Sequence, residues 1–172
     1  MTEGERIADQ LRRAIGGAAW HGDPVTTLLA DVDAATAAAR PIPGAHTIWE
    51  LVLHMTTWVR VPLRRLGGAR VTPSPDEDWP AVGAPSESGW RHAVQSLRDG
   101  HESLARAAAA LSDGALAGTV SGTDHSAYVM LHGAVQHTLY HAGQIALLKK
   151  AARAGAATAA VSAAPPDRPA AP

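Results

Sequence analysis

The sequence predicts an all-α protein, a four-helix bundle with a short extra N-terminal helix. Apolar residues recur with helical spacing over several long segments, and recognisable capping residues stand where these segments begin. No run of β-branched residues alternates convincingly with polar ones, as a half-buried strand would require. The chain has 172 residues, which is enough for one domain with a sizeable core.

The first part of the chain predicts two helices. Residues 4–15 form the short N-terminal helix, which ends at a pair of glycines. Asp23 can cap a second helix and Pro24 can occupy its first turn, where the missing N–H costs nothing. This second helix is expected to run to about residue 39, ahead of a Pro-rich turn.

A capping box predicts the start of the next long helix. Thr47 supplies the hydroxyl cap and Glu50 stands three residues later, so the helix is expected to span residues 47–66. Pro62 lacks an N–H and clashes with the preceding turn, which predicts a kink or an early end near Val61.

The second half of the chain predicts two further helices separated by loops. A Pro-rich loop over 70–85 is longer than most helix connections, so we expect it to cover a site or to mediate contacts. The helices are expected at residues 86–111 and 126–154, with a Gly-rich loop over 113–125 between them. Residues 1–154 thus form the domain, and the Ala/Pro-rich residues 155–172 are expected to be disordered.

The composition excludes several function classes. A formal net charge of −1 with mixed signs gives no electrostatic surface for nucleic acid or an anionic membrane. The absence of cysteine removes disulfides, thiolate metal sites and a cysteine nucleophile. Neither a signal-peptide core nor a membrane-length apolar stretch is present, so the expected location is the cytoplasm.

A histidine pair in the last predicted helix is the most informative motif. His137 and His141 are four residues apart, which places both imidazoles on one helix face, one turn apart. Two neutral imidazoles in this arrangement can bind one divalent cation. At about 100° per residue, His132 falls on the opposite face, so it is expected to pack against another helix or a partner subunit.

A third ligand is available from the helix over 47–66. His54 lies at the edge of its apolar stripe, beside Leu51 and Trp58, and is therefore turned inward. A buried imidazole needs a partner for its ring nitrogens, and either a metal or a hydrogen-bond acceptor such as a backbone carbonyl would serve. His101 is a rival as a fourth ligand, although a hydrogen-bonded core position is the simpler prediction. The remaining histidines are assigned to solvent: His21, His46, His92 and His125.

The residue after His137 separates this site from the zinc proteases. Thr138 stands where the H-E-x-x-H motif has its glutamate, so the general base of those enzymes is missing. Three neutral imidazoles would leave a metal its full charge and an open position, which a water, an external thiolate or a substrate carbonyl could fill. Imidazole suits Zn, Ni, Fe and Cu, so the ligands do not select among these metals.

Two segments carry a resemblance to a known family. The run from Thr47 to Trp58 (TIWELVLHMTTW) and the later run from His137 to Ile145 (HTLYHAGQI) are similar to those of the DinB-like, or DinB/YfiT-like, superfamily. The segments AWHG at 19–22 and ARPIPGAHTIWELVLH at 39–54 resemble it as well. The resemblance covers nearly the whole chain except the tail.

The resemblance implies a four-helix bundle of DinB/YfiT-like type with a divalent metal between its helices. Carried over to this sequence, the ligands are His54, His137 and His141, and the metal is of the zinc, nickel or iron type. Characterised relatives include thiol-dependent transferases and isomerases that use mycothiol or bacillithiol, and metal-dependent hydrolases. Dimers are common, so a homodimer is expected. Thr138 departs from the family, which often has an acidic residue there.

Three functions remain open at this point. The first is a metal-dependent enzyme, a hydrolase or a thiol S-transferase, acting on a small molecule with a low-molecular-weight thiol or a water as nucleophile. Its substrate contacts are expected from Trp58, Tyr140 and Gln144 and from the loop over 70–85. The second is a non-enzymatic metal-binding interaction or stress-response protein, and the third is a metal-free bundle with hydrogen-bonded core histidines.

Overall fold

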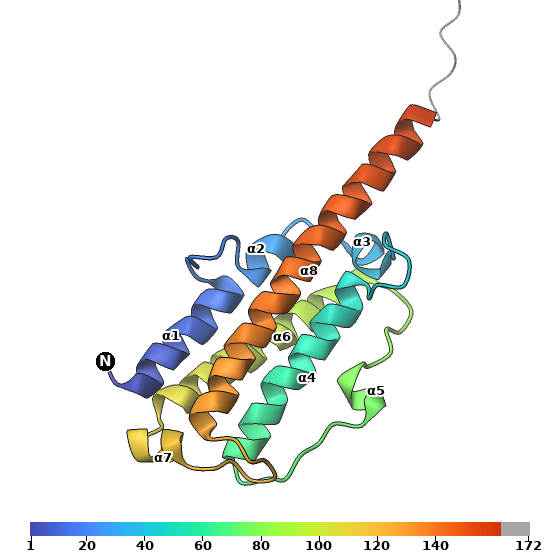
Figure 1. The fold of residues 1–172 in the computed structure, drawn as a ribbon. Coiled ribbons are helices and arrows are strands. Elements are labelled where there is room, and N and C mark those ends of the chain that lie inside the picture. The colour runs from blue at the N-terminus through green and yellow to red at the C-terminus, as the bar shows by residue number, and fades with distance from the viewer. Residues whose placement is uncertain (163–172) are drawn as a thin grey trace, which may run out of the picture.

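The computed structural model describes residues 1–162, with side chains up to residue 155. This part of the chain is all-helical, as the sequence predicts, and contains no strand beyond two isolated bridges. Four long helices form the body: α1 (Glu3–Gly16), α4 (Ile48–Leu66), α6 (Glu87–Ala109) and α8 (Ala127–Ser162). Helix α6 packs against α1 and α4, and α8 packs against the same two, so the four helices enclose one core (Figure 1).

Helix α4 carries the first part of the candidate site, and its start is the one predicted. Thr47 accepts from the Glu50 amide while the Glu50 side chain accepts from the Thr47 amide, which completes the capping box. The early end expected near Val61 was wrong, because the helix continues past Pro62 to Leu66. Packing of the buried Val59, Val61 and Pro62 outweighs the hydrogen bond that proline removes.

The helix expected over residues 24–39 was wrong. The structure has two short helices there, α2 (Val25–Leu29) and α3 (Ala34–Ala38). The Asp33 side chain accepts from the Thr36 amide and so caps a new helix, which breaks the first. Asp31, in the intervening turn, pairs with Lys149 and Arg153 of α8, and this tertiary contact fixes the break.

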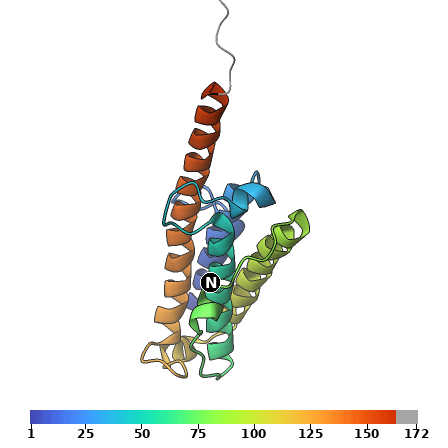
Figure 2. The same ribbon diagram turned by 90° about the vertical axis from the view of Figure 1, so that its right-hand side faces the viewer.

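The two predicted loops each contain a short helix. Helix α5 (Pro75–Asp78) lies within the loop over 70–85, and α7 (Asp113–Ala117) within the loop over 113–125. Helix α8 passes the expected end at Ala154 and reaches Ser162, projecting beyond the other helices (Figure 2). Disorder was expected over residues 155–172; residues 155–162 continue α8 instead, and residues 163–172 lie outside the described residues.

A polar layer divides the core of the bundle. One apolar cluster surrounds Trp49 and Trp90, and the other surrounds Leu11 and Leu104. Between them lie buried polar side chains from the middle of three helices: His54, His101, Thr138 and His141. Burying four polar groups is costly unless each has a partner, so this layer marks where a function is to be sought. Within residues 1–162, no helix is long and apolar enough to cross a membrane.

Candidate metal centre

Three histidines from two helices converge in the polar layer. His54 comes from α4, and His137 and His141 come from successive turns of α8. Nε2 of His137 lies 3.0 Å from Nε2 of His54 and 3.0 Å from Nε2 of His141. All three ligand atoms lie within 4.8 Å of one another. The structure therefore brings together the three side chains that the sequence proposed as ligands.

Hydrogen bonds at the far side of two rings fix their tautomers. Nδ1 of His54 lies 2.9 Å from the Asp78 carbonyl oxygen and 3.1 Å from an Asp78 carboxylate oxygen, both of which only accept. Nδ1 of His141 lies 2.6 Å from Oε1 of Gln144. Both rings therefore carry their proton on Nδ1 and present an Nε2 lone pair to the centre of the cluster.

The cluster has more lone pairs than protons. The Nε2 lone pairs of His54 and His141 both point at Nε2 of His137, and a single proton there can satisfy only one of them. A divalent cation among the three nitrogens would accept all three lone pairs at once. The donor set thus fits a metal ion and fits a network of ordinary hydrogen bonds poorly.

The spacing of the nitrogens also suits a metal. Imidazole nitrogens bind zinc at about 2.0–2.1 Å, so two ligands subtending 90–109° are roughly 2.8–3.4 Å apart. The two Nε2 separations of 3.0 Å fall in the lower half of this range. Three ligands on one side leave further coordination positions free, which is typical of catalytic rather than structural sites.

The environment keeps the two α8 imidazoles neutral, which is the form that binds metals. Burial, followed by repulsion from His141 and His54, lowers the pKa of His137 to about 3. Burial is also the main cause of the lowered pKa of His141, which the hydrogen bond to Gln144 partly opposes. His137 and His141 are therefore neutral at neutral pH, without a metal to displace protons from them.

Aromatic rings enclose the cluster on the α4 and α5 side. The Trp79 ring stacks on His54 with centroids 3.9 Å apart, and Trp58 donates from Nε1 to the Asp78 carboxylate. His46 is exposed, as its assignment to solvent implies, and its ring also stacks on the other face of Trp79 at 3.6 Å. Trp79 directly follows α5, which packs on α4, and this position brings its ring between those of His46 and His54.

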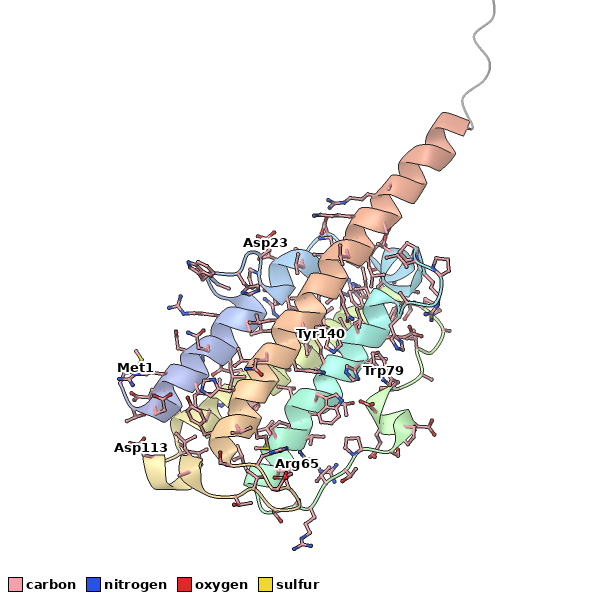
Figure 3. All side chains as sticks on the ribbon, viewed as in Figure 1. Met1, Asp23, Arg65, Trp79, Asp113 and Tyr140 are labelled. Atoms are coloured by element: carbon pink, nitrogen blue, oxygen red, sulfur yellow. The ribbon has the colours of Figure 1, made fainter. Side chains whose placement is uncertain are left out.

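The α8 side of the cluster is more open. Tyr140 packs its ring edge against His141, with centroids 5.1 Å apart, while 66% of the residue remains exposed. Figure 3 shows Tyr140 on α8 and Trp79 beside α4, so the two residues come from different elements around the cluster. The three expected neighbours all lie beside the cluster. Trp58 lies beside His137, and Tyr140 beside His141. Gln144 bonds to Nδ1 of His141.

Asp78 and Trp79 are the site residues that sequence reasoning missed. Both belong to the loop over 70–85, whose unusual length was the one available signal. Helical spacing relates residues within a single helix, and cannot place a residue of a loop against His54. The short helix α5 does so, through the Asp78 oxygens and the Trp79 ring.

His101 and His132 stay outside the cluster. The buried His101 bonds through Nδ1 to the Leu97 carbonyl and through Nε2 to the Thr138 hydroxyl, both at 3.0 Å. It is therefore a hydrogen-bonded core residue and not a fourth ligand. The Thr138 hydroxyl also lies 2.9 Å from the Ala134 carbonyl oxygen, so it has a structural partner on each side. His132 packs against Tyr128 with ring centroids 4.4 Å apart.

His101 predicts a specific pH dependence of stability. Burial lowers its pKa from 6.5 to about 4, so the unfolded chain binds a proton there that the folded chain refuses. Stability should therefore fall as the pH drops from 6.5 toward 4, by about 3 kcal/mol from this residue. In denaturant titrations across this window, His101→Leu should flatten the pH dependence relative to wild type. An unchanged slope would contradict the assignment.

The group that orients His141 predicts a graded loss of metal affinity. Gln144→Ala removes the acceptor that bonds to His141 Nδ1, so metal affinity should fall by about 10- to 100-fold in a competition titration with a chelating dye. Asp78→Asn should cost less, because the backbone carbonyl still holds His54. Gln136→Ala, on the exposed face of the same helix, is the matched control. Equal effects of all three changes would contradict the orienting roles of Gln144 and Asp78.

Comparison with known proteins agrees with the site. The family model of the DinB superfamily matches residues 19–145, a stretch that contains all three histidines. Searches of curated proteins and of solved structures found no significant match.

Proposed function

Because this chain belongs to the DinB superfamily, we propose that His54, His137 and His141 hold one divalent cation and that the protein is a metal-dependent enzyme acting on a small molecule. Two reactions suit such a centre, thiol-dependent S-transfer and hydrolysis. The metal is zinc, nickel or iron, since three imidazoles suit each of them.

One observation carries this proposal. Three Nε2 atoms meet in the middle of the bundle, and two of them are held as lone-pair donors by Asp78 and Gln144. A structural metal site would be closed by a fourth protein ligand. Within residues 1–155, the group able to hold a metal comprises only the three histidines, which favours an open, reactive centre.

The residues around the cluster have separate tasks in this proposal. Asp78 and Gln144 fix the orientation and protonation of two ligands. Trp58 and Trp79 cover the α4 side and keep water from the rings they contact. Tyr140 stands at the exposed side, where an incoming molecule would meet its ring or hydroxyl. Thr138 takes no part in proton transfer, because it is bonded to His101 and the Ala134 carbonyl.

When bound, the metal supplies positive charge that acidifies a coordinated water or thiol and polarises an electrophile. Asp78 is the carboxylate that contacts the cluster, and it is already committed to His54 and Trp58. A nucleophile that needs no protein base is therefore favoured. A thiol ionises more readily than water, and this supports the transferase over the hydrolase.

An activity screen tests the enzymatic proposal. Metal-loaded protein is assayed against small electrophiles and esters, with and without added low-molecular-weight thiols. We expect turnover that is lost in His54→Ala and retained in His132→Gln, a change at a histidine outside the cluster. Turnover that persists in folded His54→Ala would refute the role of the metal. Metal binding without any turnover would favour the alternative of a non-enzymatic interaction protein.

Exposed apolar side chains on α8 support the expected homodimer. Tyr128 and Val129, near the start of this helix and away from the cluster, are 43% and 52% exposed. A helix that leaves large apolar residues in water gains free energy by covering them with a second copy. Sedimentation of wild type and Val129→Ser is expected to give a dimer and a weakened dimer respectively, and a wild-type monomer would remove this part of the proposal.

A further inference from the structure

A small apolar cavity lies next to the candidate metal centre. Its volume is about 240 Å³, and it lies between the chain before α4, α4 itself and α8. The apolar part of its lining is formed by Ile42, Ala45, Leu51, Leu147 and Leu148. Leu51 and Leu148 are almost fully buried, whereas Ile42 is 38% and Leu147 62% exposed. The cavity thus has a buried apolar floor and an apolar rim that faces water.

Two polar residues join this cavity to the histidine cluster. Gln144 lines the cavity and accepts from Nδ1 of His141. His46 lines it as well, and stacks on the Trp79 ring whose other side covers His54. The Gln144 side chain therefore separates the cavity from His141, and His46 and Trp79 lie between the cavity and His54.

Gln144 also has a free donor. Its Oε1 is occupied by His141, and its amide nitrogen has no acceptor among the described residues. A polar group of a bound molecule can accept from this nitrogen while an apolar group fills the cavity. An engineered cavity of about 150 Å³ is known to hold benzene, so the larger space beside Gln144 suits a phenyl ring or a chain of several carbons.

We propose that this cavity is the specificity pocket for the apolar end of an amphiphilic small molecule whose polar head binds at the three-histidine centre. This inference rests on the proposed metal function and adds the class of substrate to it. An alkyl or aryl group is favoured over a charged one, because the lining is apolar apart from Gln144 and the His46 ring.

A series of straight-chain alkyl hydroxamates tests the pocket. The hydroxamate head chelates zinc whether the natural reaction is transfer or hydrolysis, and its chain length can be varied from about two to eight carbons, which spans the size of the cavity. Affinity for the zinc-loaded protein is measured by calorimetry. Each methylene that enters the cavity should raise the affinity about three- to fourfold, until the cavity is full.

Matched variants locate the effect in the cavity. Ala45→Phe should fill the cavity, so that affinity no longer rises with chain length, while the shortest hydroxamate binds as before. Leu147→Ser should reduce the increase in affinity per methylene. This change is at an exposed rim position and should not affect folding. Val129→Ser, at a comparably exposed position of α8 outside the cavity, should leave the rise in affinity with chain length unchanged.

The outcomes separate this inference from the proposed function. Binding that does not depend on chain length would overturn the pocket and leave the metal centre intact. The pocket would also be overturned if Leu147→Ser changed the oligomeric state instead of the chain-length dependence of affinity, because a second copy would then cover the rim. Failure of every hydroxamate to bind zinc-loaded protein would overturn the open metal centre itself, and the pocket with it.

Discussion

His137→Ala is expected to abolish high-affinity metal binding. Nε2 of His137 lies 3.0 Å from both other ligand atoms, so its loss leaves two nitrogens on different helices with nothing between them. Losing a group that only orients a ligand costs about 10- to 100-fold in affinity, and losing a ligand should cost well over about 100-fold. Equilibrium dialysis of untagged protein against zinc, nickel or cobalt should give about one equivalent for wild type and almost none for the variant.

The control for this result lies on the same helix. His132→Gln removes an imidazole from α8 without touching the cluster, since His132 packs against Tyr128 instead. It should retain the full equivalent of metal, and His54→Ala and His141→Ala should lose it. Retention of metal by His137→Ala would mean that the three histidines serve only the core, which is the metal-free alternative.

Metal binding should also stabilise the fold strongly. A ligand that binds only the folded state, at roughly 100 to 1,000 times its Kd, contributes about 3–4 kcal/mol. For a domain of this size such a gain raises the Tm by about 5–15 °C. Calorimetric scans with and without a chelator should show this shift in wild type.

The shift should require the cluster and not merely the presence of metal in solution. The ligands belong to α4 and α8, so the metal ties together two helices that also pack directly. His54→Ala should lose the shift and His132→Gln should keep it. An equal shift in both variants would place the stabilising metal elsewhere in the chain.

The three metal ligands could be predicted from the sequence, because helical spacing determines which residues share a face. Two histidines four residues apart must share a helix face, and the apolar stripe of the other helix turns His54 inward. The groups that orient these ligands could be predicted only in part. Gln144 is close to the pair on the same face, whereas Asp78 reaches His54 from a loop, through a contact that no periodicity describes.

The fold, too, could be predicted where it depends on local contacts but not where it depends on residues distant in the chain. The capping box at Thr47 depends on local hydrogen bonds, and the helix begins where the sequence predicts. The break between α2 and α3 depends partly on Asp31 pairing with α8, which lies far along the chain, and the sequence predicts one helix there. Likewise, the sequence predicts that His46 is exposed, but not that Trp79 of a distant loop stacks on its ring.

The number of imidazoles bound to the metal tests the central claim most directly. X-ray absorption spectroscopy of zinc-loaded wild type reports the imidazole ligands through their characteristic outer-shell scattering. We expect three imidazoles at about 2.0–2.1 Å, with the remaining ligands being light atoms of solvent. One imidazole fewer is expected in any residual metal-bound fraction of His54→Ala. A wild-type spectrum with fewer than three imidazoles would contradict the assignment of His54, His137 and His141 as one site.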